Sequence, residues 1–163
     1  MSDAPATAPR RVTVARRFCG PPDSGNGGYT CGRVAAALPG VVEVTLKRPP
    51  PLERELQLVR TPDGVSLLDG ELVVATGRRA TLALQPPPCP GLAAATEAAA
   101  RYHGLEEHAF PSCFVCGTGR APGDGLRIFA GDARAEGLVA CPWKPGAELA
   151  DANGQVRPEF VWA

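Results

Sequence analysis

Apolar and polar residues alternate along most of the first half of the chain, and a period of two is typical of half-buried β-strands. The alternation predicts strands over residues 11–18, 41–48, 54–60, 65–77 and 78–85. TPDG at 61–64 is a strong turn signal, and Asp69-Gly70 marks a bulge or a turn within the fourth of these segments. The first half is therefore expected to form an antiparallel sheet whose strands are joined mostly by short turns.

A helical repeat interrupts this alternation after the first expected strand. From about Asn26, apolar residues recur at roughly helical spacing, at Tyr29, Val34, Ala35 and Leu38. Pro39 and Gly40 end the helix. Because its side chains are mostly small, the helix is expected to lie close against the sheet.

The second half of the chain begins at a proline-rich boundary, PPPCPG, over residues 86–91. The segments expected after it are an alanine-rich helix at 92–110, a loop rich in glycine and cysteine at 111–125, and a hairpin with strands near 126–129 and 137–141. A last helix is expected to begin at Pro158, because proline suits the first turn of a helix.

The charge balance and the lengths of the apolar runs limit the kinds of partner and the location that the protein can have. The 17 Lys and Arg residues balance the 17 Asp and Glu residues, which argues against a nucleic acid or an anionic membrane as partner. No apolar run approaches the roughly 20 residues of a membrane helix, and residues 1–10 lack the apolar core of a secretory signal. Residues 1–10 are expected to be a disordered tail and the protein to be cytoplasmic, with most of its six cysteines reduced.

The stretch FCGPPDSGNGGYTCGRVAAAL, residues 18–38, places five glycines and two prolines around the start of the expected helix. The first N–H groups of a helix are unpaired and carry partial positive charge, and glycine lets a ligand approach them closely. The alternative is structural: Asp23 or Ser24 caps the helix, and the glycines only permit tight packing on the sheet.

Four segments of the chain are distinctive: GPPDSGNGGYTCGRVAAAL at 20–38, VEVTLKRPPPL at 42–52, HAFPSCFVCGTGRAPGDGLRIFAG at 108–131 and FVWA at 160–163. These segments resemble bacterial proteins of the thioesterase-like hotdog superfamily. The resemblance implies an α+β hotdog fold, in which a central helix is wrapped by a curved antiparallel sheet.

On this resemblance, residues 11–85 form a hotdog unit and 86–124 a connector made of a helix and the cysteine-rich loop. Residues 125–163 form a hairpin and the start of a second, incomplete unit, either because the member is short or because the chain is cut. The hairpin is then expected to add to the first sheet or to pair with another chain. Because hotdog units usually pair, a homodimer or larger homo-oligomer is expected.

The resemblance implies hydrolysis of acyl-CoA or a related acyl thioester. The N–H groups of Gly27 and Gly28 are the candidates for holding the oxyanion formed when water attacks the carbonyl. Asn26 is expected to orient the water or the carbonyl, and Asp23 to act as general base.

Gly25 and Tyr29 are the remaining candidates, as substrate-binding residues beside that oxyanion site. Many hotdog thioesterases carry an acidic residue on the central helix, and this chain has none between Tyr29 and Leu38. Glu159 is a weaker candidate for supplying an acid across an interface. A non-catalytic hotdog module that binds an acyl ligand or a partner protein therefore stays open as the alternative.

Cys113-Phe-Val-Cys116-Gly has the spacing of half a tetrahedral zinc site. His108 is the third candidate ligand, and His103 and Cys89 also lie upstream. Two alternatives stay open, a redox dithiol and, with more weight, small buried apolar residues under a long loop. No other cofactor is expected.

Overall fold

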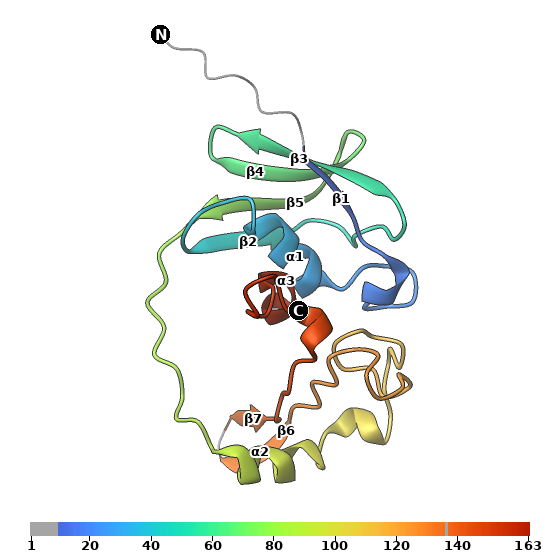
Figure 1. The fold of residues 1–163 in the computed structure, drawn as a ribbon, viewed down its shortest axis with the longest axis vertical. Coiled ribbons are helices and arrows are strands. Elements are labelled where there is room, and N and C mark those ends of the chain that lie inside the picture. The colour runs from blue at the N-terminus through green and yellow to red at the C-terminus, as the bar shows by residue number, and fades with distance from the viewer. Residues whose placement is uncertain (1–9, 136) are drawn as a thin grey trace.

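The computed structural model of the chain describes residues 10–135 and 137–163, which form a mixed structure of the α+β class (Figure 1). Its strands are β1 (Arg10–Thr13), β2 (Val42–Leu46), β3 (Glu55–Thr61), β4 (Gly64–Asp69), β5 (Leu72–Arg79), β6 (Gly131–Ala135) and β7 (Leu138–Ala140). Its helices are α1 (Gly27–Ala35), α2 (Leu92–Ala99) and α3 (Pro158–Trp162), with 3-10 turns at Arg16–Phe18, His103–Leu105 and Ala147–Leu149.

The first five strands form one antiparallel sheet in the order β1-β3-β4-β5-β2. The β3–β4 hairpin closes tightly where Thr61 pairs with Gly64, which confirms the predicted TPDG turn. The predicted Asp69-Gly70 turn is also confirmed, because β4 ends at Asp69 and Gly70 has a φ of +59° that favours glycine. A register shift between Leu67 and Leu68 adds a bulge to the β4–β5 hairpin.

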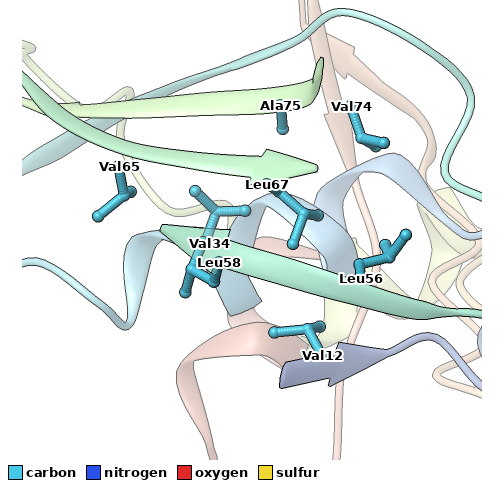
Figure 2. Packing of buried hydrophobic residues seen from close by; sticks show 8 residues of the cluster. All are labelled: Val12, Val34, Leu56, Leu58, Val65, Leu67, Val74 and Ala75. Atoms are coloured by element: carbon cyan, nitrogen blue, oxygen red, sulfur yellow. The ribbon is translucent and has the colours of Figure 1, made fainter. Parts of the chain in front are cut away.

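Helix α1 covers one face of this sheet and supplies Val34 to the core between them (Figure 2). Leu56 and Leu58 of β3 are 0% and 5% exposed, as the alternation of apolar residues predicts. Each such side chain contributes about 1.5–3 kcal/mol relative to an exposed one. The remaining core residues are Val12, Val65, Leu67, Val74 and Ala75.

The strand predicted over residues 78–85 is wrong, because β5 ends at Arg79. Its neighbour β2 begins at Val42, opposite Arg79, so the strand pairing stops there. Residues 81–90 are exposed and carry no regular structure, although Leu82 and Leu84 continue the alternation. An alternating pattern needs a neighbouring strand to become a sheet, and the sequence does not show where that neighbour ends.

The hairpin of the second half also differs from its prediction. The strand predicted at 126–129 is wrong, since Leu126 N and Ile128 N donate instead to the carbonyls of Phe114 and Val115, both at 2.8 Å. The hairpin forms later, as β6 and β7, and makes a separate two-stranded sheet beside α2. It therefore does not add to the first sheet. The long helix predicted at 92–110 is shorter, because α2 ends at Ala99.

Helix α3 begins at Pro158, as predicted, and lies alongside α1 (Figure 1). A second buried cluster joins it to the loop of the second half, and consists of Val14, Tyr29, Phe114, Leu126, Leu149 and Phe160. The predicted tail at 1–10 lies outside the described residues except for Arg10, which begins β1 instead. Within the described ranges, no helix has both the length and the apolar character needed to cross a membrane.

Candidate functional site

Asn26 is the N-cap of α1 and fixes where the helix begins. Its Oδ1 accepts a hydrogen bond from Tyr29 N at 2.9 Å, and its carbonyl oxygen accepts from Thr30 N at 3.0 Å. The alternative in which Asp23 or Ser24 caps the helix is therefore wrong, because the cap lies further along the chain. The acceptor atom of the Asn26 side chain is committed to the cap, so this residue positions the first helical amides.

Backbone hydrogen bonds hold the glycine-rich loop before α1. Gly20 N donates to Ser24 O at 3.0 Å, and Gly25 N donates to Pro50 O at 2.8 Å. The two N–H groups that follow Asn26, those of Gly27 and Gly28, find no acceptor among residues 10–135 and 137–163. They are the free donors that the sequence predicts at this position.

Gly28 is covered by the backbone of α3. A Cβ atom at this position would meet the carbonyl oxygen of Trp162 and lie 2.9 Å from Ala163 Cα. One turn later, a Cβ at Gly32 would lie 2.6 Å from Glu159 Cα. Tight packing thus explains both glycines, and the partner is the helix α3 rather than the sheet.

Gly27 lies on the other side of the helix start, where a shallow cavity of about 380 Å³ opens. The cavity is lined by Pro21, Ser24, Gly25, Gly27, Leu46, Lys47, Arg48, Pro49 and Pro50. Of the predicted site residues, Gly25 and Gly27 line it, whereas Asp23, Asn26, Gly28 and Tyr29 do not. The structure therefore brings only part of the predicted site to one cavity.

Lys47 and Arg48 are the charged residues of this cavity, and sequence reasoning missed both. Both side chains are exposed, and both backbone N–H groups donate to Val74 O, at 2.8 and 3.2 Å. These bonds extend the pairing between β2 and β5 and hold the two cations at the cavity. Their proximity to Gly27 depends on the tertiary fold, so the adjacent pair in the sequence gave no specific signal.

Tyr29 is buried, whereas Asp23 is exposed to solvent. Tyr29 is 3% exposed and stacks on Phe18 with ring centroids 4.3 Å apart, inside the second buried cluster. Its hydroxyl accepts from Arg33 Nη1 at 3.0 Å. Asp23 is exposed in the loop before the helix. Its carboxylate has to reach the cavity from the solvent side to act as a base.

The cysteine-rich loop reaches the same helix start. The Sγ atoms of Cys113 and Cys116 lie 3.6 Å apart, and Asn26 Nδ2 donates to Cys113 Sγ at 3.9 Å. Burial is the main cause that raises the pKa of the Cys116 thiol, followed by its hydrogen bond with Cys113, while Tyr102 acts in the opposite direction. The two thiols thus form a partly buried pair beside the N-cap of α1.

Both ring nitrogens of His108 have other partners in this structure. Its Nδ1 accepts from Phe110 N at 2.9 Å, and its Nε2 lies 3.0 Å from Tyr102 Oη. Over the described part of the chain, no three His, Cys, Asp or Glu side chains are arranged to hold a metal ion. The residues present supply two of the four ligands that structural zinc requires, so a bound zinc stays a prediction.

No protein-family model, no curated protein and no solved structure matches this chain.

Proposed function

We propose that the protein is a thioesterase-like hotdog protein that binds an acyl thioester in the cavity beside Gly27 and hydrolyses it. The observation that carries this proposal is the cavity of about 380 Å³, which reaches a helix N-terminus with an unpaired N–H group. One helix packed against a five-stranded antiparallel sheet supports the fold assignment. The apolar part of the lining, formed by Leu46 and three prolines, suits an acyl chain.

The chemistry follows from the partial positive charge at the start of α1. The thioester carbonyl oxygen accepts from Gly27 N, and the negative charge that forms on it when water attacks is stabilised there. Asp23 takes the proton of that water, and the tetrahedral intermediate then expels the thiolate. Asn26 acts by fixing the helix start through its cap. Lys47 and Arg48 attract the phosphates of a carrier such as coenzyme A.

A second function, binding without hydrolysis, is favoured by the composition of the cavity wall. The lining holds no carboxylate and no imidazole among the described residues, and Asp23 lies outside it. A site with an oxyanion donor and no base binds the thioester and leaves it intact. The same cavity would then bind an acyl ligand, or an acyl group carried by a partner protein, without cleaving it.

We further propose a cytoplasmic homo-oligomer. The strand β2 is an edge of the sheet, so its outward N–H and C=O groups are open to pairing with a second copy. All six cysteines lie within the described ranges and are free thiols, as in proteins of a reducing compartment.

The test is a panel of acyl-CoA substrates of increasing chain length, assayed for release of the free thiol. Asp23→Ala is expected to lower turnover at least about a hundredfold, the usual contribution of a general base. Asp63→Ala, at an exposed aspartate in the β3–β4 turn, is the matched control. Turnover that survives Asp23→Ala and Asn26→Ala would exclude the roles assigned to these two residues, while the protein would still be a thioesterase. Binding without turnover on any chain length favours the non-catalytic module.

A further inference from the structure

The two sulfur atoms of the cysteine-rich loop are placed to react with each other. Cys113 and Cys116 lie in one tight turn, closed by the hydrogen bond from Gly117 N to Cys113 O at 2.9 Å. Their Sγ atoms are 3.6 Å apart, and a disulfide bond of about 2.0 Å requires the sulfurs to close the remaining gap by side-chain rotation in the turn. We propose that Cys113 and Cys116 form a reversible disulfide by exchange with a small-molecule disulfide, and that this oxidation loosens the N-cap of α1.

The different exposure of the two thiols sets the order of the exchange. Cys116 is partly exposed, whereas Cys113 is 6% exposed. The Cys116 thiol loses its proton to solvent, and its thiolate attacks one sulfur of the small disulfide and releases the first small thiolate. The deprotonated Cys113 then attacks Cys116 Sγ in the mixed disulfide and releases the second. Two protein thiols are oxidised, one small disulfide is reduced to two thiols, and those thiolates take up the protons.

Asn26 connects this dithiol to the helix. Its Nδ2 donates to Cys113 Sγ at 3.9 Å, while its Oδ1 accepts from Tyr29 N. Formation of the disulfide moves Cys113 Sγ toward Cys116 and makes it a poorer acceptor for Asn26. The amide of Asn26 then loses one of the two contacts that fix its orientation, and the cap on Tyr29 N weakens. Formation of the disulfide does not depend on the proposed function. An effect of the disulfide on substrate binding does rest on the proposed function.

The sequence around the pair allows a direct measurement. Trypsin cleaves after Arg101 and Arg120, and the peptide 102–120 contains Cys113 and Cys116 and no other cysteine. Reduced full-length protein is incubated with oxidised glutathione, blocked with an alkylating agent and digested. We expect this peptide to carry no alkyl group and to weigh about 2 Da less than the reduced peptide. Free thiols should fall from six to about four.

Two cysteine variants and a measurement of bound zinc test whether the disulfide forms specifically between Cys113 and Cys116. Cys116→Ser is expected to abolish the light peptide, and Cys89→Ser, which removes an exposed cysteine elsewhere, is expected to leave it unchanged. Alkylation of both cysteines in the wild-type peptide, or linkage of Cys113 to Cys19, overturns the proposal. About one equivalent of zinc that shields both thiols from the oxidant also overturns it.

Coupling to the helix has its own readout, which requires no enzymatic activity. Hydrogen exchange at Tyr29 N is compared between the reduced and the oxidised protein, because this N–H donates to the Asn26 cap. We expect exchange at this amide to become severalfold faster on oxidation. Reduction with a dithiol should restore the original exchange rate. Equal exchange in both forms overturns the coupling.

Discussion

Gly32 of α1 and Glu159 of α3 lie so close that a Cβ atom on the glycine would be 2.6 Å from the Cα of the glutamate. The same Cβ would lie 2.9 Å from Trp162 Cβ, so an added methyl group meets both main chain and side chain. Gly32→Ala therefore has to push α3 away from α1. We expect it to lower the free energy of unfolding by about 1–3 kcal/mol, measured by urea denaturation.

The matched control for this change is Gly27→Ala, in the same helix. Its Cβ meets only Leu46 Cδ2, at 3.3 Å, and that methyl group lies at the end of a flexible side chain. We expect a change within about 0.5 kcal/mol. Helix propensity alone would stabilise both variants, because alanine is the better helix former. Equal losses from the two substitutions would therefore mean that the contact with α3 does not decide the effect.

The cap at Asn26 predicts a second stability change. Asn26→Ala removes the acceptor of Tyr29 N and should lower the free energy of unfolding by about 1 kcal/mol. Asn26→Asp keeps an oxygen acceptor and adds a negative charge at the positive end of α1, so it should recover most of the loss. Thermal unfolding of the three proteins tests this order. An aspartate as destabilising as the alanine would show that Nδ2, through Cys113, is the important contact.

Much of the sheet can be predicted from sequence, because its determinants are local. Leu56 and Leu58 alternate with polar residues, and turn residues mark both hairpins that join β3, β4 and β5. The strand predicted at 78–85 fails because its partner β2 begins opposite Arg79, and the alternation of one segment carries no information about the length of another.

Only part of the candidate site could be predicted, because some of its features are local in the sequence and others depend on distant segments. The glycines around residue 27 indicate unpaired helical amides, and the N–H groups of Gly27 and Gly28 have no acceptor among the described residues. The sequence does not show that α3, more than a hundred residues away, covers Gly28 and leaves Gly27 beside a cavity. Nor does it show that Lys47 and Arg48 line that cavity.

Tyr102 predicts a dependence of stability on alkaline pH. Burial, then its hydrogen bond to Cys116 and the charges of the two thiols, raise the pKa of Tyr102 from 10.0 to about 12. Below pH 10 the folded and unfolded states both keep the phenolic proton, so this stabilisation is fully present. Between pH 10 and 12 the unfolded state loses the proton first, and the free energy of unfolding falls.

The measurement is an alkaline titration of phenolate absorbance. The chain has two tyrosines, so the difference between the wild type and Tyr102→Phe isolates the group in question. We expect the difference curve to have its midpoint near pH 12 while the protein stays folded. A midpoint at pH 10 would contradict the placement of Tyr102 against the dithiol.

The cations beside the cavity give the prediction that bears most directly on the ligand. Lys47 and Arg48 are exposed and line the same cavity as Gly27. On the proposed function, they meet the phosphates of coenzyme A. Charge reversal by Lys47→Glu with Arg48→Glu is expected to raise the Kd for an acyl-CoA about tenfold or more, or about 1.4 kcal/mol. The loss should shrink at high salt because exposed charges are screened. Lys144→Glu with Arg134→Glu, which reverses two exposed cations outside this cavity, controls for net charge.

An acyl thioester of pantetheine, which lacks the phosphates, separates the two parts of this ligand. Its Kd, measured by calorimetry, should be nearly the same for the wild type and the double variant, since the proposed function places the acyl group against Leu46 and the prolines of the lining. A parallel loss of both ligands would mean that the substitutions distort the cavity. An unchanged Kd for acyl-CoA would place its phosphates elsewhere and remove this cavity as the site of a coenzyme A thioester.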